Sequence, residues 1–259
     1  MSNSQNQERR IKFLEGITVD GAPMAYIMIL AGLIIVLSFF PFSIVYASGG
    51  SFPVAEGLFP LVGWLLGPIA GALTTFIGRA IGIIVAPRTA GVALVSLWSA
   101  TLGSFAAGAM VTEGKRSRWW IPLTVIFSIK LLLFAGRAMV QHGISPWAAI
   151  VGSLLDWSGV LLFALPTRTM IARWLKQENL GLVILGLFLG TWIVSGVIHV
   201  SSAVFTYYMF NWSEDIWIAL IPIIPVETLY RCIIGTVFGT AIISVARAYN
   251  LQKPTAAVY

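Results

Sequence analysis

Charged and amide side chains recur inside an apolar stretch in the middle of this chain. Lys130, Arg137 and Gln141 are spaced i, i+7 and i+11, which places them on one face of a single helix. His142 follows directly and continues the polar face toward the expected outer end of that helix. A guanidinium group binds a carboxylate through two parallel hydrogen bonds. The spacing therefore predicts a site for an anionic or carboxylate-bearing small solute, with Arg137 as its main anchor.

Other ionisable residues in apolar stretches extend this candidate site. Asp156 is expected at a depth similar to that of Lys130 and would neutralise it, while His199 is expected in the outer half of its own span. Glu227 and Arg231 are one helical turn apart and can form a structural ion pair. Ionisable groups at bilayer depth are costly and are functional candidates by default. The alternative is that the acids each neutralise one base, the other bases extend toward water, and His199 is a structural histidine.

The balance of these charges bears on the ligand. The ionisable residues expected near bilayer depth are the bases Arg79, Lys130, Arg137 and Arg231 and the acids Asp156 and Glu227. Bases exceed acids by two, and an anionic ligand would balance that excess. We therefore expect a small-molecule substrate whose charge is negative.

Several other chemistries have no support in the sequence. Two histidines and one cysteine, far apart, offer neither a metal-binding pair nor a catalytic metal motif. The only Gly-Lys pair, Gly114-Lys115, lacks the residues of a nucleotide-binding P-loop. We expect no catalytic residue, no metal site and no bound cofactor, and any use of ATP would have to come from partner subunits.

The composition defines the class of protein. Of the 259 residues, 58% are hydrophobic and 10% are charged, whereas soluble domains carry about 25% charged residues. The mean hydropathy is +0.89. The chain is therefore expected to cross a membrane several times and to contact lipid. The excess of sixteen Lys and Arg over ten Asp and Glu reports membrane topology rather than nucleic-acid binding.

The apolar runs predict an all-α bundle of membrane helices. They comprise Pro23–Tyr46, Ala55–Gly67, Ile69–Ala86, Gly91–Val111, Trp119–Val140, Pro146–Leu165, Leu180–Tyr208 and Ile216–Val245. This gives either eight crossings or six full spans plus a bent hairpin, about 20 residues being the usual length of a span. Residues 23–248 would form one transmembrane domain between two cytoplasmic tails, 1–22 and 249–259.

Glycine spacing singles out the second and third runs. Gly63, Gly67 and Gly71 are four residues apart, so on a helix they would form one face without side chains, where a neighbouring backbone can approach closely. Pro68 interrupts the run because it has no N–H and disfavours helix at the residue before it. We predict a tight, bent hairpin on which other helices pack; a single kinked helix is the alternative.

The basic residues predict the orientation. Both tails, counted with the adjoining Arg247, and the loops 113–118 and 168–176 hold eleven of the sixteen bases, and such loops face the cytoplasm. All four lie on one side only if an odd number of crossings separates Tyr46 from Glu113. The hairpin satisfies this condition and the single kinked helix does not. We expect a multi-pass protein of the plasma or inner membrane with both termini in the cytoplasm.

The run from Ser48 to Pro87 resembles the substrate-capture (S) components of energy-coupling-factor vitamin transporters. The resemblance rests on Gly49-Gly50-Ser51-Phe52-Pro53, on Leu61–Leu66 and on Gly67-Pro68-Ile69-Ala70-Gly71-Ala72-Leu73, with Ile77-Gly78 and the basic loop at 115–118 in support. It implies a subunit that binds a small, water-soluble nutrient from the outer side. A transmembrane coupling protein and ATPase subunits would then drive uptake.

Two functions of other classes remain open. The chain could be a structural or assembly subunit of a larger membrane complex, in which the glycine faces and the ten tryptophans would serve as interfaces. It could also be a membrane-embedded enzyme or translocator acting on lipid-like anions, with Lys130 and Arg137 clamping the head group. Retention of a small solute, or of a large protein complex, would distinguish these functions.

Overall fold

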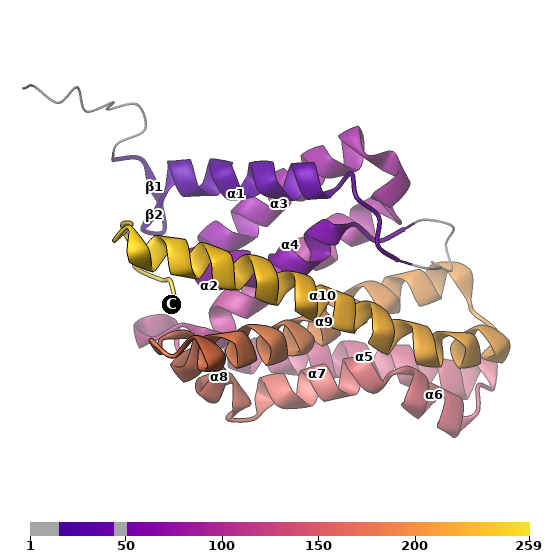
Figure 1. Ribbon diagram of the computed structural model, residues 1–259. Helices are drawn as coiled ribbons and strands as arrows, with labels where there is room; N and C mark the ends of the chain where they lie inside the picture. The colour runs from indigo at the N-terminus through magenta and orange to yellow at the C-terminus, as the bar shows by residue number, and fades with distance from the viewer. Residues whose placement is uncertain (1–15, 44–50) are drawn as a thin grey trace, which may run out of the picture.

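The computed structural model is a bundle of long helices, most of which run along one common direction (Figure 1). It describes residues 16–43 and 51–259. Residues 1–15 of the predicted first tail, the end of the first predicted span up to Tyr46, and Gly49 and Gly50 of the family resemblance lie outside the described residues. The prediction of an all-α bundle is confirmed.

The elements follow one another along the chain in a simple order. A short hairpin of β1 (Thr18–Val19) and β2 (Ala22–Pro23) precedes the helices. The α-helices are α1 (Met24–Leu37), α2 (Phe59–Leu66), α3 (Pro68–Val85), α4 (Ala93–Val111), α5 (Trp120–His142), α6 (Pro146–Gly152), α7 (Leu154–Ala164), α8 (Thr167–Leu175), α9 (Leu180–Phe210) and α10 (Glu214–Ala248). The 3₁₀ helices are η1 (Val54–Leu58), η2 (Pro87–Thr89) and η3 (Gly114–Arg116).

Length and composition make the described chain a multi-pass membrane protein. Five helices or helix pairs are long and apolar enough to span a bilayer: α3, α4, η3 with α5, α9 and α10. The bent pair α6–α7 provides a sixth candidate, and α1 and η1–α2 are shorter apolar segments. These eight segments correspond one to one to the eight apolar runs of the sequence.

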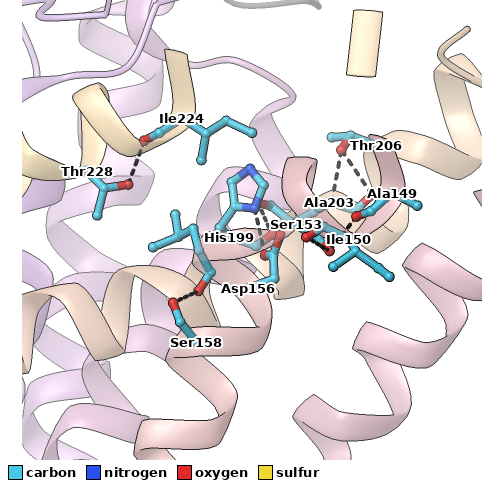
Figure 2. Close-up of polar contacts among 12 residues, drawn as sticks. Ala149, Ile150, Ser153, Asp156, Ser158, His199, Ala203, Thr206, Ile224 and Thr228 are labelled. Atoms are coloured by element: carbon cyan, nitrogen blue, oxygen red, sulfur yellow. Dashed lines mark hydrogen bonds and ion pairs between the residues drawn. The ribbon is translucent and has the colours of Figure 1, made fainter. Parts of the chain in front are cut away.

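The predicted span Pro146–Leu165 consists of two helices, α6 and α7, rather than one. The segment is bent by 59° between α6 and α7. Ser153 stands at the break, where its hydroxyl donates a hydrogen bond of 2.6 Å to the carbonyl oxygen of Ala149 (Figure 2). Such a bond from a serine to the preceding turn competes with the helical backbone and often bends it.

The predicted hairpin forms, and Gly67 and Pro68 make its turn. Gly67 has φ +85° and ψ 176°, a conformation that is essentially restricted to glycine, and Pro68 is the first residue of α3. All eight residues of α2 are buried. The short first arm therefore runs through the centre of the bundle, covered by other helices rather than by lipid.

Two of the three glycines in the predicted ladder lie in a helix contact. A Cβ atom on Gly71 would lie 2.8 Å from the Cα of Gly63, and one on Gly63 would lie 2.2 Å from the carbonyl oxygen of Ser104 on α4. These distances leave no room for a side chain. Gly67 lies at the turn, where it contacts Ala256 of the C-terminal segment and where its backbone also faces Gly108 of α4.

The last residues of the chain complete this turn. The carbonyl oxygen of Trp64 would normally accept a hydrogen bond from residue 68, but proline has no N–H to donate. The backbone N–H of Val258 takes that place, at 2.9 Å. Val258 is buried at 4% exposure. The region 249–259, expected to be a tail, therefore packs against the bundle.

The basic loops gather at one end of the bundle. Arg116 in η3 forms an ion pair with Asp20 between β1 and β2, and Arg247 donates hydrogen bonds to the carbonyl oxygens of Leu175 and Gln177 beyond α8. We call this the basic end, comprising β1–β2, η3, α8 and residues 249–259, and the opposite one the far end. Among the described residues, those from 16 to 22, both loops and the C-terminal segment therefore lie at one end of the fold. The cytoplasmic orientation of this end stays a prediction. Residues 16–22, expected as part of a tail, instead include β1 and the first residue of β2.

The glycine contact predicts a large effect of a bulky side chain at position 71. Gly71→Leu should lower the melting temperature in detergent, because overpacking of a close contact typically costs about 1–3 kcal/mol. Gly136→Leu is the matched control, since a Cβ atom at Gly136 would meet no atom within 4 Å. Equal melting temperatures for the two variants would contradict the packing role.

The C-terminal contact predicts that deletion of residues 254–259 destabilises the bundle. The deletion exposes the carbonyl oxygen of Trp64 and the α2–α3 turn, and a buried polar group left without a partner costs about 1–3 kcal/mol. Thermal unfolding of the full-length and shortened chains would measure the loss. An unchanged melting temperature would show that the segment is dispensable for folding.

Candidate functional site

Six elements enclose a polar cavity in the half of the bundle nearer the far end. Its charged and hydroxyl lining comprises Glu56, Arg79, Thr89, Ser96, Ser99, His199, Ser202 and Arg231, and its apolar lining comprises Phe52, Ala90, Gly91, Val95 and Ile198. The cavity measures about 30 Å³, which is room for about two water molecules. We refer to it as the polar cavity.

A histidine–aspartate pair forms one wall. Nδ1 of His199 on α9 lies 2.7 Å from Oδ1 of Asp156 on α7. In the tautomer that has its hydrogen on Nδ1, the ring donates this hydrogen bond to the carboxylate. Figure 2 shows the ring held by Asp156 at this edge, with its opposite nitrogen directed away from the carboxylate. Asp156 is fully buried. The pair thus fixes the ring and leaves Nε2 to a ligand or water.

An ion pair forms the opposite wall. Nε of Arg231 on α10 lies 2.9 Å from Oε2 of Glu56 in η1, and both side chains are less than 10% exposed. The guanidinium also faces the ring of Phe52 at 4.7 Å and that of Phe42 at 5.6 Å. The expected pair within α10, Glu227 with Arg231, is thus replaced by a pair between η1 and α10. Glu227 is buried one turn away from Arg231.

Arg79 forms the third side and ties the α3–α4 connection to the helices. Its Nε and Nη2 donate to the hydroxyl of Ser96 at 3.0 and 2.7 Å, and Nη2 donates to the carbonyl oxygen of Thr89 at 2.7 Å. The side chain is 1% exposed. These bonds hold a permanently charged group at a fixed position beside the cavity.

Lys130 does not pair with Asp156, which corrects the sequence interpretation; Oδ1 of that carboxylate is bound by His199. The ammonium instead lies over the ring of Trp98 at 5.2 Å and within 6.0 Å of the ring of Phe205. Cation–π contacts of this kind attract a cation without neutralising it. Within the described chain its nitrogen is buried without a hydrogen bond. Neither Lys130 nor Trp98 is among the residues that line the polar cavity.

Arg137 closes the end of a helix rather than facing a pocket. It donates 3.1 and 2.8 Å hydrogen bonds to the carbonyl oxygen of Tyr207 and to Oδ1 of Asn211, where α9 ends. Its Nε donates to Gln141 at 3.0 Å, and it stacks on Tyr208 at 3.9 Å. His142 contacts the ring of Tyr207. Arg137, Gln141 and His142 are therefore brought together, as predicted, but at the far end and away from the polar cavity.

The structure also changes the charge balance. Fully buried charges are Arg79 and Arg231 against Glu56, Asp156 and Glu227. With the half-buried Lys130 the two signs are equal, and Arg137 lies at the far end. The excess of two bases that pointed to an anionic ligand is absent, since Glu56 was not counted and Arg137 was placed too deep. The cavity presents both signs of charge.

The sequence interpretation missed Glu56, Ser96 and Ser99. Glu56 was detectable as the single acid in the apolar run Ala55–Gly67, but that run was interpreted from its glycine spacing alone. The serines carried no signal, because hydroxyls are common in membrane helices. Among the described residues, no group of three or more His, Cys, Asp or Glu side chains could hold a metal ion.

Comparisons with protein-family models, curated proteins and solved structures returned no match for this chain.

The contacts of Arg137 predict a structural effect of its removal. Arg137→Ala should lower the melting temperature by an amount equivalent to about 1–3 kcal/mol, because the end of α9 loses its hydrogen-bond donors. Gln141→Ala, which removes one of these hydrogen bonds, should have a smaller effect. If Arg137→Ala had a normal melting temperature but lost a bound solute, Arg137 would instead be the ligand anchor that the sequence predicted.

Proposed function

We propose that this protein is the substrate-binding subunit of a membrane transporter and captures a small, polar, water-soluble solute in the polar cavity. The observation that supports this most strongly is the convergence of the His199–Asp156 pair, the Arg231–Glu56 pair and Arg79 on one interior cavity. Charged groups inside a membrane bundle are costly, and six elements contribute to this arrangement.

The mixture of charges indicates the class of solute. Arg231 offers donors to a carboxylate or another anionic group and Arg79 adds positive charge nearby, while Glu56 and the Asp156-oriented imidazole can accept from an ammonium or hydroxyl group. A zwitterionic or neutral polar solute with both kinds of group satisfies the cavity better than a simple anion. In the conformation described here the walls leave space only for water, so they must move apart to admit such a solute.

The partners and the orientation follow from the family resemblance and from the charge pattern. The resemblance to S components implies a transmembrane coupling protein and ATPase subunits that power uptake. The basic end would face the cytoplasm under the positive-inside rule. The polar cavity, nearer the far end, would then receive its solute from outside a plasma or inner membrane.

The other two functions receive less support. Lys130 and Arg137 contact different partners, so they do not form the head-group clamp that a translocator of lipid-like anions would need. An assembly subunit explains the glycine contacts, but it gives no reason for charged pairs around an interior cavity. No observation favours either function over solute capture.

The proposal predicts that the purified full-length protein retains a small solute. Mass spectrometry of compounds released on denaturation should find one enriched species with polar groups. His199→Asn should reduce its recovery strongly, because the imidazole is lost, while the side-chain amide still has an N–H to donate to the buried Asp156 and so limits the loss of stability.

His142→Ala is the matched control, since this second histidine is exposed at the far end and lies outside the cavity. It should retain the solute as the unmodified protein does. Equal recovery from both histidine variants would refute the cavity as the binding site. Recovery of no solute, together with co-purification of a large stable complex, would favour the assembly function.

A further inference from the structure

A second, separate groove lies at the basic end, between the end of α4, η3 and α8. Its volume is about 320 Å³. Its floor includes Val111 and Ala172, and its polar rim includes Ser117, Arg168, Arg173 and Lys176. We refer to it as the basic groove. It shares no residue with the polar cavity.

Among the described residues, two of the three basic side chains of this groove are bound to neighbouring residues, and the third is not. Arg168 uses Nη1 to donate 2.8 Å hydrogen bonds to the carbonyl oxygens of Ala164 and Leu165, which closes the end of α7. Lys176 pairs with Glu113, and this hydrogen bond and positive charge hold the pKa of Glu113 below its usual value. Glu113 therefore stays ionised and neutralises Lys176. Arg173 is exposed, and within the described chain no hydrogen bond or ion pair engages its side chain.

The groove adjoins a surface suited to lipid chains. The guanidinium of Arg168 lies 3.5 Å from the centroid of a Trp120 ring, and Trp with Arg is typical of the depth at which lipid head groups lie. From there α5 exposes Ile121 and Val125, which are four residues apart on one helical face. The cationic rim therefore lies where a phospholipid would place its phosphate. The apolar face beyond the tryptophan lies where it would place its acyl chains.

We propose that the basic groove binds an anionic phospholipid, with its phosphate between Arg168 and Arg173 and its acyl chains along the Ile121–Val125 face of α5. Three bases against the single acid Glu113 give the rim a net charge of +2. Basic pockets at the ends of membrane helices commonly select anionic head groups in this way. The proposal does not depend on the transport function.

The test is the thermal unfolding of the purified full-length protein during lipid titration. Phosphatidylglycerol should raise the melting temperature, whereas phosphatidylcholine and inorganic phosphate should leave it unchanged, because a ligand that binds the native state stabilises it by mass action. Arg173→Ala should require about fivefold more phosphatidylglycerol, which corresponds to about 1 kcal/mol for one base near the membrane surface.

Two variants make the result specific. Arg88→Ala removes an exposed arginine at the far end and should leave the titration unchanged, and Arg173→Lys should retain most of the effect through its charge. Equal stabilisation by phosphatidylcholine would show a non-selective lipid surface and overturn the proposal. Stabilisation by inorganic phosphate alone, or identical titrations of Arg173→Ala and Arg88→Ala, would also overturn it.

Discussion

A buried backbone carbonyl needs a hydrogen-bond donor, and at the α2–α3 turn this chain supplies one from a distant segment. Pro68 deprives the Trp64 carbonyl of its helical donor, and the N–H of Val258 replaces it. The turn lets α2 return as α3 at backbone contact, with Gly63 and Gly71 touching. The central position of α2 and the placement of α1, α3 and α4 around it all depend on this close approach.

The interior charges obey a second constraint, which is that each needs a partner from another element. Asp156 and His199 join α7 to α9, Glu56 and Arg231 join η1 to α10, and Arg79 binds the α3–α4 connection. An ion pair within one helix would not link that helix to another element, whereas these contacts fix the elements around the polar cavity. The same bonds that stabilise the arrangement also orient the groups that a solute would meet.

Arginine side chains perform the same task at both ends of the bundle. The basic end holds η3, α8 and the C-terminal segment, with Arg116, Arg168 and Arg247 each bound to a neighbouring element. The far end holds Arg137, which closes α9. Arginine is thus used at both ends to satisfy carbonyl oxygens where helices stop, which is a task that five N–H donors suit well.

The sequence by itself determined the membrane class, the eight apolar segments, the hairpin at Gly67–Pro68 and the gathering of basic loops, because hydropathy, glycine spacing and proline act locally. It placed Lys130, Arg137 and Gln141 on one helical face, but it did not determine which residues that face contacts. Only the tertiary structure decided that Asp156 binds His199, that Arg231 binds Glu56, and that Arg137 closes α9. These pairings join residues 43, 175 and 70 positions apart, and periodicity along one helix carries no information about which other helix lies against it.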